Sequence, residues 1–294
     1  MPLLISTIAE ERSATLGALS PEVSSARAPL KAPAAKAGAC GGCRGASNMH
    51  SIRIPRDRTR DADNPAGRTV MIEEPPPLVF APEAERPPAE LVERFRGAPT
   101  SFIVDAMGGT GALDWRIKPL VGRSLLGVAL TCDCGPLDNL AFMAALSQCR
   151  PGDVLVVATG GHAGAAVAGD LLIGVARNRG AAGFVTDGLV RDLDDLEAFG
   201  VPVYAMGVSP NSPQRRGPGT VGLPVVCGGV TVASGDVVIG DRDGVVVVPR
   251  ARIAATLASL EHVKASEAAT LERVRAGLKD LPVEVPSLRG IGKA

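Results

Sequence analysis

The chain has 294 residues, and its 31 basic and 31 acidic side chains leave a formal net charge of zero. Hydrophobic residues make up 46% and charged residues 21%, as in ordinary globular proteins. This balance excludes a protein held on nucleic acid by an overall basic charge. Six cysteines are too few for a disulfide scaffold, and no apolar run reaches the ~18 residues of a membrane span.

Residues 1–70 differ in composition from the rest of the chain. They contain none of the eight aromatic residues, and their ten basic and six acidic side chains give them a charge of about +4. Such a segment buries too little apolar surface to offset the entropy lost on folding. A solvated tail, a targeting leader and a stretch upstream of the true start all stay open. We expect residues 1–75 to form this disordered extension, 76–282 one domain and 283–294 a loose tail.

Hydrophobic periodicity predicts a mixed α/β domain after the extension. Apolar residues at helical spacing, followed by turn residues, predict helices at 89–96, 101–106, 137–149, 169–179, 192–199 and 251–276. Short apolar runs between Gly, Pro or Asp predict strands at 125–132, 153–158, 182–186, 203–206, 221–227, 230–232, 237–239 and 245–248. The order is an alternating middle, a β-rich end and a closing helix.

Two units in residues 160–202, each a strand followed by a loop and a helix, form the clearest candidate site. In parallel α/β units such loops meet at the carboxyl ends of the strands, where ligands bind. The free N–H groups at the first helix start suit an anion such as a carboxylate. They belong to Gly169, Asp170, Leu171 and Leu172. Across the crevice, Arg191 offers a guanidinium fork and Asp192 a hard oxygen ligand for a divalent cation.

These residues also fit a purely structural interpretation. Asp170 and Asp192 fall where acidic residues stabilise helix N-termini, and Arg191 could simply pair with a neighbour. The residue types alone leave both interpretations open.

The spacing between Asp170 and the pair Arg191–Asp192 resembles the motif of the RraA-like family, which includes class II pyruvate aldolases. Other segments share the resemblance: SFIVDAMGGTGALDWRIKPL, PGDVLVV, GFVTDGLVRD, VPVYAMGVSP and CGGVTVASGDVVIGDRDGVVVVP. Ala166 departs from the family pattern, which usually has Gly four residues before the acidic position. The resemblance implies a three-layer β/β/α domain of the swivelling type, assembled as a homotrimer or homohexamer.

The resemblance also implies a reaction and roles for the residues. The reaction is a retro-aldol cleavage of a 4-hydroxy-2-oxo acid to pyruvate, with oxaloacetate decarboxylation through the same enolate. Asp192 would hold Mg²⁺ or Mn²⁺ largely through water, Arg191 would place positive charge at the enolate oxygen, and Asp170 would position a water that returns the proton. The amides from Gly169 to Leu172 would hold the carboxylate.

A glutamate from a neighbouring subunit completes the outer shell of the metal in the family. Glu267 is the first candidate for this role and Glu272 the second, although each also fits a solvated helix face. Arg215 and Arg216, in the loop 211–219, are candidates for recognising a second carboxylate of the substrate, or are solvated.

Other residues give weaker signals. A Schiff-base aldolase needs a desolvated lysine, and Lys118, in a segment typical of an exposed turn, is the nearest one. His162 in the glycine loop either touches substrate or is incidental. Cys40 and Cys43 form a lone CxxC pair, a weak metal or redox signal. The other cysteines lie beside apolar elements, and such buried thiols fit a reducing, cytoplasmic compartment: Cys132, Cys134, Cys149 and Cys227.

A non-catalytic function is the main alternative, because the RraA-like family also includes regulators that bind and inhibit ribonuclease E. The combination of Asp170, Arg191 and Asp192 favours an enzyme, since a binding module needs no chelating trio. We therefore expect a carbon–carbon lyase that binds a small 2-oxo acid and has no nucleic-acid or membrane partner.

Overall fold

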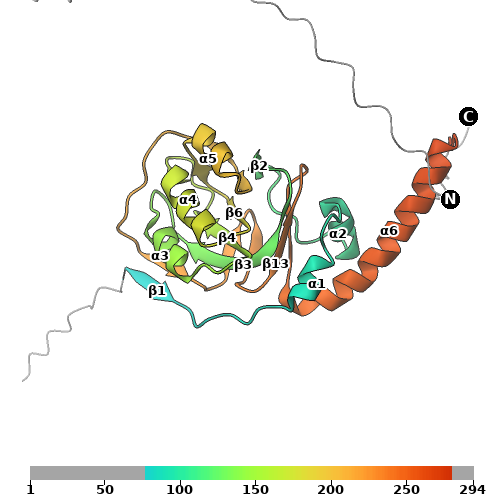
Figure 1. Ribbon diagram of the computed structural model, residues 1–294, viewed down its shortest axis with the longest axis horizontal. Helices are drawn as coiled ribbons and strands as arrows, with labels where there is room; N and C mark the ends of the chain where they lie inside the picture. Colours follow the sequence, from blue (N-terminus) through green and yellow to red (C-terminus); the bar gives the residue numbers. More distant parts are fainter. Residues whose placement is uncertain (1–76, 280–294) are drawn as a thin grey trace, which may run out of the picture. The chain divides into compact units, whose positions relative to one another are not determined.

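The computed structural model describes residues 77–279, which are organised around one large mixed β-sheet (Figure 1). Its strands are β1 Leu78–Phe80, β2 Lys118–Val121, β3 Leu125–Asp133, β4 Asp153–Ala158, β6 Gly183–Thr186, β8 Val203–Ala205, β10 Gly219–Val221, β13 Val237–Gly240 and β14 Val245–Val248. They lie in the order β1-β10-β3-β4-β6-β8-β2, with β13 paired to β3 and β14 paired to β13. The central strands β3, β4, β6 and β8 are parallel, which confirms the predicted alternating middle.

Three helices cover one face of this sheet: α3 Leu140–Gln148, α4 Asp170–Asn178 and α5 Leu193–Phe199 (Figure 1). Each follows a strand, because a parallel pair needs a crossover between its strands. Phe142 on α3 packs against Phe184 on β6 with ring centroids 5.1 Å apart. Both rings are fully buried, and burying a side chain of this size contributes about 1.5–3 kcal/mol.

The other face of the sheet carries a second β layer, which the hairpin β11 Val225–Cys227 and β12 Val230–Val232 provides. Alternate residues of β4 serve the two faces: Leu155 and Val157 pack under the helices, and Val154 and Val156 pack with the hairpin. This period of two is what a strand buried on both faces requires.

A separate helical group packs around β13 and β14 (Figure 1). It consists of α1 Ala89–Glu93, α2 Thr100–Ala106 and α6 Ile253–Arg275. The first turns of α6 are anchored by Ile253, Leu257 and Leu260, whereas residues 261–275 are mostly exposed. The helices, the large sheet and the hairpin layer together confirm the expected mixed α/β fold.

A second, smaller sheet positions the candidate site. It contains β5 Ala166–Ala168, β7 Leu189–Val190 and β9 Gly207–Val208 in parallel, with β7 in the centre. These strands follow β4, β6 and β8 along the chain. The expected direct connections from loop to helix in residues 160–202 were therefore wrong in detail, because β5 and β7 intervene. Strands of two or three residues are too short to show a hydrophobic period.

Two other predicted elements need correction. The helix expected at 137–149 begins only at Leu140, because Leu137 adopts a left-handed conformation (φ 60°) that no helix continues. The strand expected at 221–227 is two strands, β10 and β11, because Gly222 turns the chain at φ 83°. The two helices expected at the ends of the domain are shorter than predicted, as the bounds of α1 and α6 show.

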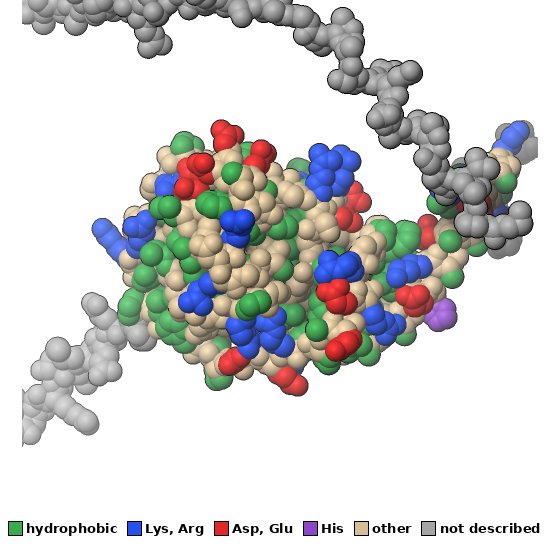
Figure 2. All heavy atoms as spheres, viewed as in Figure 1, with side chains coloured by type: hydrophobic (Ala, Val, Ile, Leu, Met, Phe, Trp, Pro, Cys, Tyr) green, Lys and Arg blue, Asp and Glu red, His purple; other side chains and the backbone are tan. Residues whose placement is uncertain are grey.

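The predictions for residues 1–75 and 283–294 lie outside the described residues, so the domain limits stay predictions. Among residues 77–279, no helix combines the length and apolar character needed to cross a bilayer. Basic and acidic side chains are interspersed over the face seen in Figure 2, so this face of the described residues offers no basic stripe for nucleic acid.

Candidate active site

The predicted site residues meet at the carboxyl edge of the small sheet. Gly169 and Asp170 follow β5, Arg191 and Asp192 follow β7, and the loop 209–217 follows β9. Because the three strands are parallel, the segments after their carboxyl ends lie side by side, which is where ligands bind in such sheets. The structure therefore brings together the two halves of the predicted motif.

Position 169 requires glycine because Asp192, in the second half of the motif, packs directly against it. Its backbone is extended (φ −143°, ψ −168°), so any residue could adopt its conformation. A Cβ at this position would lie 2.4 Å from Asp192 Oδ2 and 3.0 Å from both Cγ and Nε of Arg191. The absence of a side chain at 169 thus allows the Arg191–Asp192 pair to pack directly on the start of α4.

Asp192 has an unusual backbone and an unusual role for its position. It precedes α5 with φ 59° and ψ 47°, a left-handed conformation that Asp tolerates better than most residues. Its carboxylate makes no capping bond to α5. Instead Oδ2 accepts hydrogen bonds from Arg191 Nε at 3.1 Å and from the Asp170 N–H at 3.4 Å. The strained turn therefore aims this carboxylate at the start of α4.

Arg191 is held on two sides. Its Nη1 donates to Ser212 Oγ at 2.8 Å, and its backbone N–H donates to the Ala168 carbonyl at 3.0 Å. The side chains of Arg191 and Asp192 remain 31% and 34% exposed. The ion pair is thus fixed in direction and still accessible to a ligand.

The first turn of α4 presents backbone donors next to this pair, and one of them, the Asp170 N–H, donates to Asp192 Oδ2. Ile173 N–H is bonded to the Gly169 carbonyl, so the N–H groups that precede it lack partners within the helix. Asp170 lies in this turn and is half-buried, Leu171 is 75% exposed and Leu172 is half-buried. The helix start lies where the sequence predicted it, and its role in binding an anion stays a prediction.

Sequence reasoning missed how the third loop is anchored. Asn211 Nδ2 donates to the Gly164 carbonyl at 3.0 Å, and buried Asp138 accepts the backbone N–H groups of Arg216 and Gly217 at 2.6 and 3.2 Å. Ser212, the partner of Arg191, was missed as well. The available signal was Asp138, an acidic residue beside an apolar run, which was interpreted only as part of a helix start.

The cavity formed by these segments has a volume of about 210 Å³. Its lining residues are Asn139, Met143, Ala166, Val167, Ala168, Gly169, Asp170, Leu171, Leu172, Arg191, Ser212, Pro213 and Arg215. Pockets for drug-sized ligands span about 300–1,000 Å³, so this cavity suits a small metabolite. All five predicted substrate-binding residues line it.

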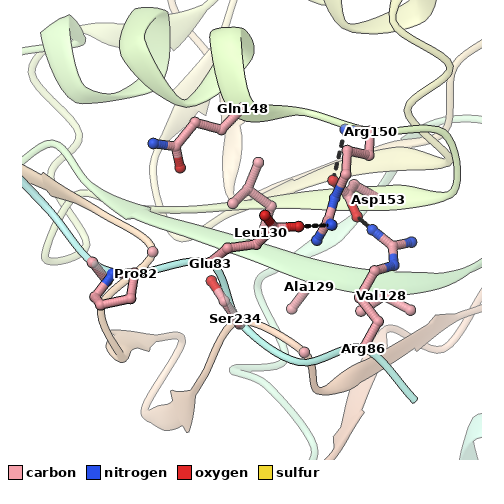
Figure 3. A pocket seen from close by; sticks show the side chains of 14 residues that line it. Pro82, Glu83, Arg86, Val128, Ala129, Leu130, Gln148, Arg150, Asp153 and Ser234 are labelled. Carbon is pink, nitrogen blue, oxygen red and sulfur yellow. Dashed lines mark hydrogen bonds and ion pairs between the residues drawn. The ribbon is translucent and has the colours of Figure 1, made fainter.

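A larger cavity, of about 270 Å³, lies elsewhere and is shown in Figure 3. Its arginines are already paired, Arg86 with buried Asp153 and Arg150 with exposed Glu83. Asp153 opens β4 and pairs with Val128, so the cavity lies at the amino end of β4. Ligands of parallel sheets bind at the opposite edge. We therefore place the candidate active site in the smaller cavity.

The neighbouring glycine loop has a structural anchor. Buried Asp187 accepts hydrogen bonds from the backbone N–H groups of Thr159 at 2.7 Å and Gly161 at 3.1 Å. The His162 ring packs over Gly164, and its Nε2 is buried without a partner among the described residues. His162 does not line the cavity of Arg191, so the interpretation as an incidental loop histidine is the better supported one.

The other candidates lie outside the cavity of this chain. Glu267 is exposed on α6, and Glu272 pairs with Arg275 at 2.9 Å. Lys118 lies on the edge strand β2 and donates to the Asp243 carbonyl. The role of Glu267 or Glu272 at the site of a neighbouring subunit stays a prediction.

The cysteines of the described residues are free and buried, as expected: Cys132, Cys134, Cys149 and Cys227. Burial raises the pKa of the Cys149 thiol to about 11 and also raises the pKa of Cys132 and Cys227. Protonated, buried thiols are neither nucleophiles nor metal ligands. The pair Cys40 and Cys43 lies outside the described residues.

The side chains at the site suit an ion such as Mg²⁺, which keeps several water ligands, better than an ion held entirely by protein side chains. Among residues 77–279, no three His, Cys, Asp or Glu side chains are grouped to hold a metal by themselves. Mg²⁺ is commonly bound through one or two carboxylates and several waters. Asp170 on the cavity wall and Asp192, whose Oδ2 accepts the Asp170 N–H, are the two carboxylates that meet that requirement.

Comparisons with known proteins show the family of this chain. The sequence profile of the family described as "RraA-like: Aldolase/RraA" matches residues 100–247. The chain belongs to the RraA-like family. A relative from Halalkalibacterium halodurans, named "Putative 4-hydroxy-4-methyl-2-oxoglutarate aldolase", is 38% identical over 162 residues, which are 55% of this chain and 77% of that protein. This relative supports the aldolase branch of the family.

Two solved structures share the fold of this RraA-like chain. Streptomyces coelicolor RraAS2, described as an unusual member of the RNase ES inhibitor RraA protein family, is 30% identical with a TM-score of 0.58 over 64% of this chain and 100% of that chain. An uncharacterized protein from Pseudomonas syringae pv. tomato is 25% identical with a TM-score of 0.58, over 67% and 97% of the two chains.

Proposed function

We propose that this RraA-like protein is a divalent-metal-dependent aldolase that cleaves a 4-hydroxy-2-oxo acid to pyruvate. The observation that supports it most is that the start of α4 and Arg191 line one cavity, and that the Asp192 carboxylate is bonded to both of them. These are an anion cradle, a positive charge and a metal-type ligand. The name of the Halalkalibacterium relative points to the same reaction.

The residues of this chain would divide the chemistry as follows. The amides of Gly169 to Leu172 bind the carboxylate next to the 2-oxo group, and Arg191 stabilises the negative charge that develops on the 2-oxo oxygen. Asp192, with water, would hold Mg²⁺ or Mn²⁺, which supplies Lewis acidity at that oxygen. The bond between C3 and C4 would break as the 4-hydroxyl passes its proton to a water in the cavity, and the electron pair of that bond would form the pyruvate enolate.

Asp170 would complete the cycle by holding the water that returns a proton to C3 of the enolate. The products are pyruvate and the carbonyl compound derived from C4. Oxaloacetate would enter the same site, lose CO₂ from C4 and leave the same enolate. We therefore propose oxaloacetate decarboxylation as a second activity of this cavity.

We further propose that the protein works in the cytoplasm as a homotrimer or homohexamer. Leu171, 75% exposed at the wall of the cavity, supports a neighbouring subunit that covers this side. Glu267 of that neighbour would then complete the outer shell of the metal. Light scattering of the purified protein tests the assembly, and a monomer would contradict it.

The structural likeness to a protein described as an RNase ES inhibitor family member keeps a regulatory function as the second candidate. A regulator that binds ribonuclease E needs an interaction surface and has no use for a left-handed Asp192 aimed at a helix start. That geometry favours the enzyme.

Pyruvate release tests the proposed function. The purified protein with Mg²⁺ should release pyruvate from branched 4-hydroxy-2-oxo diacids and from oxaloacetate, as followed with lactate dehydrogenase and NADH. EDTA should abolish the release, and excess Mg²⁺ or Mn²⁺ should restore it. Full turnover in EDTA would contradict the metal, and no release from any substrate, together with inhibition of ribonuclease E, would establish the regulator.

A further inference from the structure

The loop after β9 contributes an arginine to the wall of the candidate active site that the proposed chemistry does not use. Arg215 lines the same cavity as Arg191 and the start of α4. Arg191 is engaged by Asp192 and Ser212. Among the described residues, Arg215 has no ion pair or side-chain hydrogen bond, so its donors are available to a ligand.

The backbone that follows Arg215 is fixed by one buried carboxylate. Asp138 is 8% exposed and accepts the N–H groups of Arg216 at 2.6 Å, Gly217 at 3.2 Å and Leu140 at 2.8 Å. Hydrogen bonds of backbone donors to a charged acceptor are stronger than neutral ones. The carboxylate therefore ties the start of α3 to the loop that carries Arg215.

Two backbone bonds strengthen the same connection. Gln214 N–H donates to the Leu137 carbonyl at 2.6 Å, and Asn139 N–H donates to the Gln214 carbonyl at 3.1 Å. Leu137 needs its left-handed conformation to present this carbonyl next to Asp138. We refer to these contacts of residues 137–140 with 214–217 as the Asp138 latch. It holds the residues on either side of Arg215 and leaves its side chain free.

Such a fixed and unpaired arginine matches a planar anion at some distance from the first carboxylate site. We propose that Arg215, positioned by the Asp138 latch, binds the distal carboxylate of the substrate and sets a preference for dicarboxylic over monocarboxylic 2-oxo acids. This inference rests on the proposed function, which places the proximal carboxylate on the amides of α4. Arg215 is then a specificity residue, and Asp138 is a positioning residue.

Equilibrium binding separates this proposal from turnover. The probes are 2-oxoglutarate and 2-oxopentanoate, two 2-oxo acids of equal chain length that differ in the distal carboxylate, measured by calorimetry with Mg²⁺ present. The wild-type protein should bind 2-oxoglutarate more tightly. Arg215→Gln should weaken 2-oxoglutarate binding by about 10- to 100-fold, the range for a lost charge-assisted hydrogen bond, and should leave 2-oxopentanoate within about 2-fold.

The matched control is Arg216→Gln, which removes a neighbouring charge of the same loop from a side chain that does not line the cavity. It keeps the backbone N–H that Asp138 accepts, so the preference for the diacid should stay as in the wild type. Arg215→Lys should recover part of the preference, because the charge remains and the fork is lost. Asp138→Asn should lower the preference by about 3- to 10-fold through the loop.

The kinetic form of the test uses 4-hydroxy-2-oxoglutarate against 4-hydroxy-2-oxopentanoate. Arg215→Gln should raise KM for the diacid by a larger factor than KM for the monoacid. Equal loss for both probes, or an unchanged preference in Arg215→Gln, would overturn the role of Arg215. A protein that binds both probes as predicted and releases no pyruvate would refute the aldolase and leave the carboxylate site standing.

Discussion

Two cavities of this chain are lined by pairs of arginines, and they place those charges differently. In the cavity of Figure 3, Arg86 and Arg150 are paired with Asp153 and Glu83, at the amino end of β4. In the candidate site, Arg191 has one carboxylate partner and Arg215 none among the described residues. The difference teaches that volume does not identify the working site. The position along the strands and the unused donors do.

The two cavities should differ most in how catalysis responds when one arginine is removed from each. Arg191→Ala should lower kcat for oxaloacetate decarboxylation about 10³-fold, because the charge that stabilises the developing oxyanion is gone. Arg150→Ala, the matched change in the other cavity, should leave kcat within about 2-fold. Steady-state assays of both variants measure the two changes in kcat, and equal changes would remove the distinction between the cavities.

A smaller loss is expected from a methyl group placed between the two halves of the motif. Gly169→Ala puts a Cβ 2.4 Å from Asp192 Oδ2, so the Asp192 carboxylate must move, and kcat/KM should fall about 100-fold. Gly207→Ala is the control, because its Cβ would meet only Leu189 Cδ2 at an ordinary 3.4 Å. A fully active Gly169→Ala enzyme would show that the packing of Asp192 on α4 is dispensable.

Asp153, in the cavity of Figure 3, should contribute to the stability of the fold and not to catalysis. Asp153→Ala removes a carboxylate that is 3% exposed, leaving Arg86 without its partner and the Arg150 N–H without its acceptor. The free energy of unfolding should drop by about 3 kcal/mol, and kcat should stay unchanged where the protein is folded. Urea denaturation measures the drop. An Asp153→Ala protein of normal stability and low kcat would move the active site to this cavity.

The smallest effect is expected at the exposed ion pair of the same cavity. Arg150 and Glu83 side chains are 43% and 74% exposed, and such pairs contribute about 0.5 kcal/mol or less. Glu83→Gln should therefore shift the urea midpoint only slightly. A loss of more than about 1.5 kcal/mol would mean that this pair, and the chain segment that carries Glu83, supports the sheet far more than its exposure suggests.

The sequence predicted the strands with long apolar runs and the helices between them, because burial on one or both faces leaves a period that can be recognised. It also predicted the halves of the site, since Gly169, Asp170, Arg191 and Asp192 follow from loop position and residue type. The small sheet could not be predicted, because its strands of two or three residues carry no period.

The anchors of the third loop were beyond prediction for a different reason. Ser212 and Asp138 act through partners distant in sequence, Arg191 and Arg216. Pairing of that kind depends on the tertiary arrangement and leaves no local pattern. Loop position and residue type therefore located the candidate groups but not the contacts that hold them in place.

The most direct test of the central claim is proton NMR of the purified protein with 4-hydroxy-4-methyl-2-oxoglutarate and Mg²⁺ in D₂O. Cleavage between C3 and C4 through an enolate predicts two molecules of pyruvate for each molecule of substrate, one of them carrying deuterium in its methyl group at early times. Arg191→Ala should show neither product at the same enzyme concentration. Intact substrate with the wild-type protein, or equal turnover by the variant, would contradict the account.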